Sequence, residues 1–148
     1  MSEAQENKIR AIAVAVIRKG DKILGGKGID ASANKIFYRL IGGGIEFGET
    51  SDVALKREFM EEMNAEIIIK KFLGVGESIF VYEGQSGHQL VFFYEAEFVD
   101  KKMYEQDEFK MLDVEEDHGH IYWADPKIDI IYPDAPKNFD KSYNKIME

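Results

Sequence analysis

Three glutamates stand within one helical turn of each other near the middle of the chain. Glu58, Glu61 and Glu62 lie in a segment, residues 51–63, that contains no glycine and no proline. Positions i, i+3 and i+4 share one face of a helix, so the spacing predicts three neighbouring carboxylates. Like charges four residues apart destabilise a helix by about 0.2–0.5 kcal/mol, and a divalent cation would relieve that repulsion. Clustered hard oxygen ligands suit Mg²⁺ or Mn²⁺, which can in turn hold phosphate oxygens.

A glycine-rich segment, residues 42–48, comes directly before this helix. Consecutive glycines let the backbone approach a ligand closely, so a carbonyl in this segment could complete a metal shell. The N-terminus of the helix beside it could hold an anion. We expect the helix to begin after an N-cap at Thr50 and to end at Asn64, because asparagine tolerates the left-handed conformation of a helix end.

The spacing alone leaves a plain alternative open. A solvated acidic helix face after an ordinary glycine turn would show the same residues, because glutamates are common on exposed helix faces. Leu55, Phe59 and Met63 lie on a neighbouring face and are expected to pack on a sheet, which places the carboxylates beside the core but not in it. Arg57 can pair with Glu61 four residues on, which offsets part of the repulsion.

Strands are expected on both sides of the helix, because β-branched and aromatic residues dominate those segments. The expected strands are residues 8–18, 22–25, 36–41, 67–72, 78–82, 89–98 and 121–123. Residues 28–35, 42–48, 83–87 and 105–120 are expected to be loops, and short helices are expected after Pro126 and near residues 138–147. This order predicts an α/β (α+β) fold with helices packed on a mixed sheet. No linker-like stretch divides the chain, so we expect a single domain over residues 1–148.

Composition narrows the range of partners. The 148 residues carry a formal net charge of −9, which repels phosphate backbones and disfavours nucleic-acid binding. The chain has no cysteine, which excludes disulfides and thiolate metal sites. No apolar run is long enough to span a bilayer, and the polar start of the chain lacks the apolar core of a signal peptide. We therefore expect a cytoplasmic protein with no membrane partner.

Residues 43–65, GGIEFGETSDVALKREFMEEMNA, resemble the Nudix box as a whole. The family pattern is G-x5-E-x7-R-E-U-x-E-E-x-G-U, where U is a bulky aliphatic residue. The residues at the required spacings are Gly43, Glu49, Arg57, Glu58, Phe59, Glu61 and Glu62. Four positions depart from it: Ile41 replaces a proline, Phe59 an aliphatic residue, Asn64 the last glycine and Ala65 the final aliphatic residue. The resemblance is specific inside the box and extends more loosely over nearly the whole chain.

The resemblance implies a fold and an activity. The fold is a Nudix-like α/β/α sandwich with a mixed central β-sheet. The activity is hydrolysis of a nucleoside diphosphate linked to another moiety, with Mg²⁺ or Mn²⁺, by attack of a metal-activated water on phosphorus. The implied metal ligands are Glu58, Glu61, Glu62 and the carbonyl of Gly42, and one of the glutamates would orient the water. Arg57 and Glu49 would form a supporting pair that holds the catalytic helix and loop in place.

Other residues are weaker candidates. Lys27 and Arg39 flank the glycine-rich segment and could reach phosphate oxygens. Four aromatic residues could stack a base or could simply pack in the sheet; these are Phe37, Tyr38, Phe80 and Tyr82. Glu115 or Glu116, upstream of Trp123, could supply a further base or metal ligand, and the alternative is solvated loop charge. The same holds for Glu105, Glu108, His118 and His120, while His88 is expected on the surface.

Two other function classes stay open. One is a catalytically silent Nudix-fold domain that binds a nucleotide or regulates a partner, and the other is a structural domain whose acidic helix binds calcium or nothing. The intact glutamates favour the hydrolase, and the chain lacks an EF-hand pattern. The substrate is not readable: a nucleotide sugar, ADP-ribose, an oxidised nucleotide, a dinucleoside polyphosphate and a capped RNA are all compatible. A homodimer is compatible with the family, but no segment identifies an interface.

Overall fold

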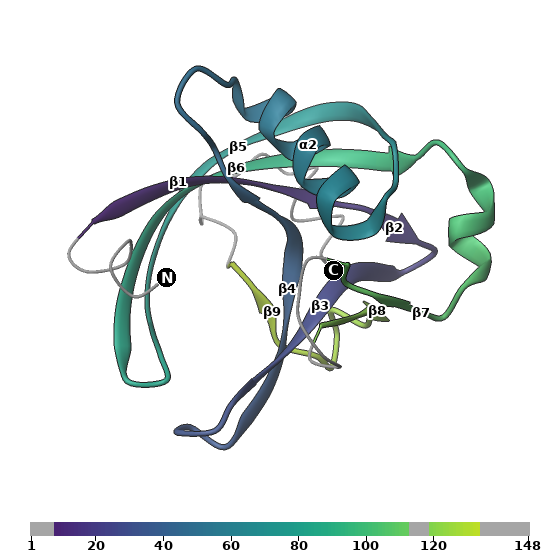
Figure 1. Ribbon diagram of the computed structural model, residues 1–148. Coiled ribbons are helices and arrows are strands. Elements are labelled where there is room, and N and C mark those ends of the chain that lie inside the picture. Colours follow the sequence, from purple (N-terminus) through teal and green to yellow (C-terminus); the bar gives the residue numbers. More distant parts are fainter. Residues whose placement is uncertain (1–7, 113–118, 134–148) are drawn as a thin grey trace.

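A strongly curved mixed sheet dominates the computed structural model, which describes residues 8–112 and 119–133 (Figure 1). Within these residues it has nine strands, one α-helix and one 3₁₀ helix. The strands are β1 (Ile9–Val16), β2 (Arg18–Lys19), β3 (Lys22–Asp30), β4 (Lys35–Gly44), β5 (Ile67–Tyr82), β6 (Gln85–Phe98), β7 (Glu108–Lys110), β8 (His120–Ala124) and β9 (Ile131–Tyr132). The helices are α2 (Ser51–Met63) and the 3₁₀ helix η1 (Lys101–Glu105).

The strand order is β5-β6-β1-β4-β3-β8-β7, with β2 paired to β3 and β9 paired to β4. The β1–β6 and β4–β9 pairs are parallel and the other pairs are antiparallel. Strand β4 joins the two halves of the sheet, because Ile41–Gly44 pair with β1 while Lys35–Leu40 pair with β3. The prediction of an α+β fold built on a mixed sheet is confirmed.

Helix α2 lies on one face of this sheet (Figure 1). It begins after Thr50 and ends at Asn64, whose backbone is left-handed with φ 49° and ψ 43°. Its apolar side, Leu55, Phe59 and Met63, is buried as the spacing predicted. The prediction of a helix over residues 51–63 is therefore confirmed, including its asparagine end.

Several loops that the sequence suggested are strands instead. Strand β3 continues to Asp30, and β4 runs through Gly42–Gly44, because each has a neighbouring strand to satisfy its backbone. Strand β5 is continuous where two strands were expected, and only Glu83 and Gly84, both with positive φ, turn it into β6. Residues 105–120 were also expected to be loop, but they contain the end of η1, all of β7 and the first residue of β8.

The two expected helices near the C-terminus have different outcomes. After Pro126 the chain makes only a turn, in which the amides of Ile128 and Asp129 donate to the carbonyl of Asp125. Residues 138–147 lie outside the described residues. Of the α/β/α sandwich, the described part thus contains the sheet and the helical layer formed by α2.

Two apolar clusters hold the fold together, one on each face of the sheet. Along β1, Ala13 and Ala15 belong to the cluster under α2, whereas Ile12, Val14 and Val16 belong to the cluster on the opposite face. This alternation follows from the two-residue period of a strand, and it leaves β1 covered on both sides.

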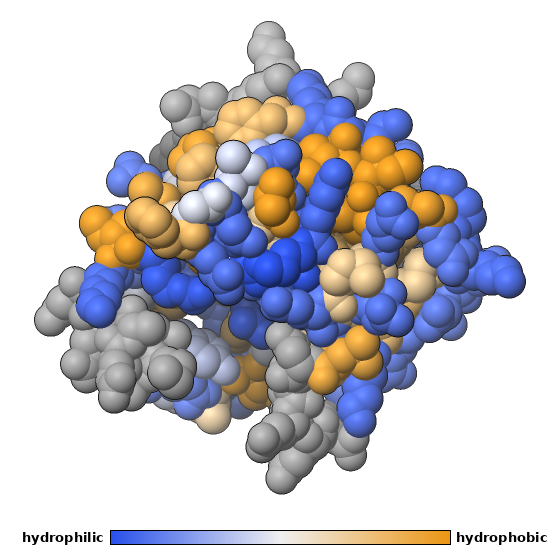
Figure 2. Space-filling view, turned by 45° about the horizontal axis from the view of Figure 1, so that its top comes forward, coloured by the Kyte–Doolittle hydropathy of each residue, from blue (hydrophilic) through white to orange (hydrophobic). Residues whose placement is uncertain are grey.

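On the face shown in Figure 2, hydrophilic side chains run across the middle, with separate hydrophobic areas on either side of them. Among the described residues, no helix has the length and the apolar character needed to cross a bilayer.

Candidate active site

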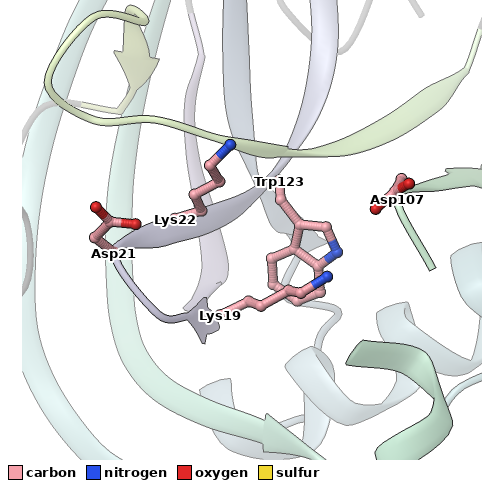
Figure 3. A pocket seen from close by; sticks show the side chains of 5 residues that line it. All are labelled: Lys19, Asp21, Lys22, Asp107 and Trp123. Carbon is pink, nitrogen blue, oxygen red and sulfur yellow. The ribbon is translucent and has the colours of Figure 1, made fainter. Parts of the chain in front are cut away.

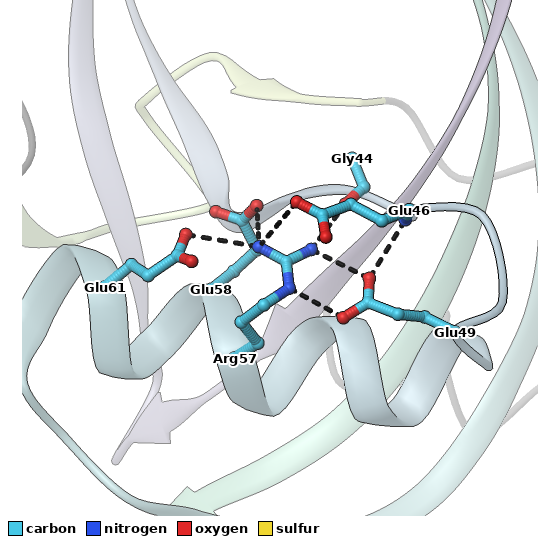
Figure 4. A network of polar contacts seen from close by, with 6 residues as sticks. All are labelled: Gly44, Glu46, Glu49, Arg57, Glu58 and Glu61. Atoms are coloured by element: carbon cyan, nitrogen blue, oxygen red, sulfur yellow. Dashed lines mark hydrogen bonds and ion pairs between the residues drawn. The ribbon is translucent and has the colours of Figure 1, made fainter.

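Arg57, in the middle of α2, lies at the centre of a network of polar contacts (Figure 4). Its Nε donates to Glu49 Oε2 at 2.7 Å and its Nη2 donates to Glu49 Oε1 at 2.9 Å. The same Nη2 donates to the carbonyl oxygen of Gly44 at 2.9 Å. This paired geometry is the strongest that an arginine and a carboxylate can form, so the guanidinium ties the helix to the loop before it and to the end of β4.

The third guanidinium nitrogen of Arg57 faces the other carboxylates. Nη1 donates to Glu58 Oε1 at 3.0 Å and to Glu61 Oε2 at 3.1 Å, and Glu46 Oε1 lies 3.8 Å away. The Arg57–Glu61 contact is the four-residue pair that the spacing predicted. Glu46 also belongs to this network, and the sequence did not predict it. Its backbone amide donates to Glu49 Oε1 at 2.9 Å. Its proximity depends on the tight loop between β4 and α2, which no spacing rule predicts.

This network perturbs the ionisation of its members. The hydrogen bonds from Arg57 lower the pKa of Glu49 to about 2, and the hydrogen bond to Glu49 raises the pKa of Arg57 above its ordinary value. The pKa of Glu58 shifts in the opposite direction: desolvation by burial raises it, although Arg57 opposes that shift. A carboxyl group with a raised pKa beside a fixed positive charge is typical of functional sites as well as of structural ion pairs.

Glu62 lies closer to the core than the helical wheel indicated. The residue is only 9% exposed, whereas the carboxylates were expected beside the core and not in it. The chain just after β7 passes close to this part of the helix, where the amide of Leu112 donates to the Glu62 carbonyl at 2.8 Å. One carboxylate oxygen of Glu62, Oε2, is buried and makes no hydrogen bond in the described part of the chain, although the side chain has other interactions.

The glycines at the end of β4 allow this close packing. A Cβ on Gly42 would overlap the carbonyl oxygen of Ala13, and a Cβ on Gly43 would overlap the carboxyl group of Glu58. A side chain at either position would push β4 away from β1 or from α2. The close approach that consecutive glycines permit is thus used here to bring a backbone edge against a glutamate of the helix.

The remaining candidate residues are placed elsewhere. Lys27 is paired with Tyr38 and Arg39 with Gly26, so Lys27 and Arg39 point to opposite faces of the sheet. Neither makes a described contact with the Arg57 network. Their contact with phosphate stays a prediction, and a single phosphate group at one face would meet only one of them.

Three of the four aromatic candidates contact other aromatic rings, whereas the ring of Phe80 lies against Gly87. Phe37 lies edge-on to Tyr82 and to Tyr132, with ring centroids 5.8 Å and 5.5 Å apart. Tyr38 lies edge-on to Tyr122 at 6.4 Å. These contacts are those of packing across strands, which was one of the two interpretations left open for these residues.

The late acidic candidates are only partly described. Glu115, Glu116 and His118 lie outside the described residues. Glu108 and His120 face each other across β7 and β8, with 2.8 Å between Glu108 Oε2 and His120 Nδ1. The Tyr122 hydroxyl also donates to Glu108 Oε2, at 3.2 Å. This group of side chains lies at the edge of the sheet, since β7 is the last strand in the order.

A separate pocket of about 430 Å³ opens beside Trp123 (Figure 3). Its lining residues are Lys19, Asp21, Lys22, Asp107 and Trp123. Lys19 Nζ lies 5.7 Å from the centre of the Trp123 ring. None of the lining residues belongs to the network around Arg57.

Sequence comparison decides the family. The model of the family described as "NUDIX domain" matches residues 7–128. This chain belongs to the Nudix family. The match extends from β1 past β8, so the resemblance of residues 43–65 is confirmed at the level of the family. No curated protein matches the chain in sequence.

Solved structures of Nudix proteins share the fold. A NUDIX hydrolase from Nitrosomonas europaea aligns with 24% identity and a TM-score of 0.50 over 63% of this chain and 61% of its own. A UDP-X diphosphatase aligns with 16% identity and a TM-score of 0.59 over 95% of this chain and 61% of its own. A MutT NUDIX hydrolase from Burkholderia pseudomallei aligns with 20% identity and a TM-score of 0.54 over 95% and 97%. The chain thus spans about three fifths of the length of the first two, and the third matches it nearly end to end.

The oxygen donors of α2, which carries the Nudix glutamates, fit a divalent cation. Glu58, Glu61 and Glu62 offer only carboxylate oxygens, and the glycine at position 43 leaves room for the Glu58 carboxyl group against the backbone of β4. These side chains are not already arranged as a ligand set: the described residues contain no group of three His, Cys, Asp or Glu side chains placed to hold a metal. Arg57 instead holds Glu58 and Glu61, so the two glutamates would have to turn from the guanidinium toward the cation.

Proposed function

We propose that this Nudix protein is a Mg²⁺- or Mn²⁺-dependent hydrolase that cleaves the diphosphate of a nucleoside diphosphate linked to another moiety. The observation that carries the proposal is the Arg57 network, which holds two helix glutamates, Glu58 and Glu61, beside the glycine end of β4. Family membership supports the hydrolase class. The structural likeness to a UDP-X diphosphatase is compatible with this class of substrate.

The residues of this chain divide into ligands and supports. Glu58, Glu61, Glu62 and the carbonyl of Gly42 would hold the cation. A bound divalent cation would neutralise the diphosphate and lower the pKa of a water molecule, so no covalent nucleophile is needed. One of the three glutamates would orient the attacking water and accept its proton, and Glu58, whose pKa is raised by burial, is suited to that exchange.

Arg57 and Glu49 have a positioning role in this proposal. Glu49, with a pKa of about 2, stays ionised throughout the physiological pH range and keeps its two hydrogen bonds to Arg57. The guanidinium of Arg57 donates to protein oxygens, so it keeps the helix and the loop together. The substrate phosphates would therefore be bound by other positively charged side chains. Lys27 or Arg39 would bind the phosphates farther from the cleaved bond. The single domain, the homodimer and the cytoplasmic location stay predictions.

A substrate screen tests the proposal. Purified protein would be incubated with nucleotide sugars, ADP-ribose, dinucleoside polyphosphates, oxidised nucleoside triphosphates and a capped RNA. Each would be tested with Mg²⁺, with Mn²⁺ and with EDTA, and the products would be separated by chromatography. We expect metal-dependent cleavage between two phosphorus atoms of at least one linked nucleoside diphosphate. Tight calorimetric binding of a nucleotide without cleavage would instead support the silent binding domain, and no divalent-ion binding at all would support the structural one.

A further inference from the structure

Arg10, the second residue of β1, reaches the glycine end of β4 from the side opposite the Nudix helix. A Cβ on Gly44 would lie 2.6 Å from Arg10 Nη2, so the guanidinium occupies the space that a side chain at this position would fill. Gly43, one residue earlier, has the Glu58 carboxyl group in the corresponding place. Because successive residues of a strand face opposite sides, the two glycines separate a carboxyl group on one face from a guanidinium on the other.

The two arginines at this point differ in their partners. Arg57 donates to the carbonyl of Gly44 and to carboxylates, so its charge is compensated within the protein. Arg10 is partly buried, yet in the described part of the chain it has neither a hydrogen bond nor an ion pair. A partly buried guanidinium without a partner is unfavourable, and in a chain of net charge −9 the absence of a carboxylate beside it is not due to a shortage of acids.

We propose that Arg10 is an anion-binding residue that holds a phosphate of the substrate at the Gly43–Gly44 end of β4. The inference rests on the proposed function for the class of its ligand, a diphosphate. The planar fork of a guanidinium suits two oxygens of one phosphate group, and the missing side chain at Gly44 leaves the space that the Arg10 guanidinium occupies. Arg10 thus provides, at the glycine end of β4, a positive charge for the phosphate. Arg57 does not offer one, because it is already hydrogen-bonded to Glu49.

Three variants and a matched control separate this role from a general charge effect. Arg10→Gln removes the charge, and Arg10→Lys keeps it but loses the fork. Arg18→Gln is the control, because it makes the same charge change at an exposed arginine. The ion pair of Arg18 with Glu95, at 3.8 Å, lies outside the Arg57 network. Gly44→Ala keeps every charge but forces the Arg10 guanidinium to move, which the end of a flexible side chain can do.

The measurement is an NMR titration of the ¹⁵N-labelled full chain with methylenediphosphonate, a diphosphate analogue that water cannot cleave, in the presence of Mg²⁺. We expect saturable shifts of the Gly44 amide and of one arginine Nε–Hε signal that is absent from Arg10→Lys. The Kd should rise about 10- to 100-fold in Arg10→Gln, less in Arg10→Lys and less than twofold in Arg18→Gln. Gly44→Ala should also weaken binding, but it should add little when Arg10 is already glutamine.

Three results would overturn the inference: no shift at Gly44 in the wild type, an unchanged Kd in Arg10→Gln, or equal losses in Arg10→Gln and Arg18→Gln. A dispersed NMR spectrum shows that each variant is folded. If Arg10→Gln does not fold, the comparison of Arg10→Lys with the wild type is used in its place. Cleavage is assayed separately on the substrate panel. A wild type that cleaves but binds the analogue without Arg10 refutes this inference alone, and one that binds through Arg10 but cleaves nothing refutes the proposed function alone.

Discussion

The guanidinium of Arg57 is bonded to protein atoms on all three of its nitrogens, and this fixes the local geometry of the Nudix helix. Two of its hydrogen bonds go to Glu49, and the others go to Gly44, Glu58 and Glu61. The role that follows is positional: the residue sets where the glutamates lie relative to the end of β4. Residues with such a role change the site when they are removed, although they touch no substrate.

Glu49→Gln is expected to change the pH dependence of stability. The pKa of Glu49 is about 2 in the folded chain against an ordinary value of 4.5, so its contribution to stability is full above pH 4.5 and is lost as the pH falls through about 2. The unfolding free energies of wild type and Glu49→Gln should therefore differ most above pH 4.5 and converge toward pH 2. Urea unfolding between pH 2 and pH 7 measures this, with Glu77→Gln, an exposed glutamate, as the control. A difference that stays constant over this range would contradict the prediction.

Glu58→Gln is expected to separate stability from metal binding. Burial raises the pKa of Glu58, so keeping its carboxyl group ionised costs more in the folded chain than in the unfolded chain, and the neutral amide removes that cost. In EDTA at pH 7.5 the Tm should rise by roughly 1–2 °C, because solvent screens part of the effect. With Mn²⁺ the wild type should gain stability by mass action and the variant should gain less. Calorimetric scans with and without Mn²⁺ decide this, and equal gains in both proteins would remove Glu58 from the ligand set.

At the scale of elements, the exit from α2 explains why the departure from the Nudix pattern at Asn64 is tolerated. The residue has φ 49°, and its amide donates to the Met60 carbonyl at 3.0 Å, which closes the last helical turn. Glycine and asparagine are the residues that adopt this conformation most easily. The family glycine can therefore be replaced here without moving the glutamates that precede it.

Asn64→Ala and Asn64→Gly test this reading of the helix end. Alanine in the left-handed region should lower the unfolding free energy by about 1 kcal/mol, because its Cβ crowds the backbone. Glycine should leave it within about 0.5 kcal/mol of the wild type or raise it. Urea unfolding measures both, and the prediction fails if alanine and glycine have the same effect.

The elements that the sequence predicted best are those with a strong local pattern. The apolar period of α2 and the β-branched run of β1 located both elements, and the period of α2 also identified the face that it buries. The strand character of Gly42–Gly44 could not be predicted, because glycine has a low strand propensity and only the close approach of β1 and of the Glu58 carboxyl group explains the glycines there. Strand β7 was missed because its residues lie among acidic ones and pair only with distant β8.

In the candidate site too, the residues predicted from the sequence are those whose roles depend on a local pattern. The Nudix pattern identified the glutamates and Arg57, because their roles depend on spacing within one helix. Arg10 and Glu46 escaped it, since they reach the glycine end of β4 only through the β1–β4 pairing and the turn before α2. Lys27 and Arg39 were proposed together from their proximity in sequence, and the register of β3 and β4 places them on opposite faces.

At the scale of the whole molecule, the curved sheet gains a short strand that lies beyond the segment matched by the family model. Strand β9 pairs in parallel with Tyr38 and Arg39 of β4, and its Ile131 packs on the cluster opposite α2. The far end of the β5–β6 hairpin touches the β3–β4 hairpin, where the Ala31 amide donates to Glu83 Oε1 at 3.1 Å. Contacts of this kind connect the strands that carry the site to the rest of the fold.

Ile131→Ala is expected to destabilise the whole domain. The side chain is partly buried, so the loss should be about 1–2 kcal/mol, below the 2–5 kcal/mol of a fully buried isoleucine. Ile128→Ala is the matched control: this residue is 80% exposed, and its loss should stay within about 0.5 kcal/mol. Thermal or urea unfolding of the two variants compares them directly, and equal losses would show that β9 adds nothing to stability.

We expect the cleavage of a diphosphate by this protein to depend on Glu58, Glu61 and Glu62 of α2, of which Glu62 is buried. The most direct test compares initial cleavage rates with Mn²⁺ for wild type, Glu62→Gln and Glu66→Gln on the panel substrate that the wild type cleaves fastest. Glu66 is the control because it follows Glu62 by four residues and is exposed. We predict that the rate falls at least about 100-fold in Glu62→Gln and is unchanged in Glu66→Gln. Equal rates in wild type and Glu62→Gln would show that cleavage does not depend on this carboxylate, and no cleavage of any panel diphosphate by the wild type would contradict the proposed hydrolase activity.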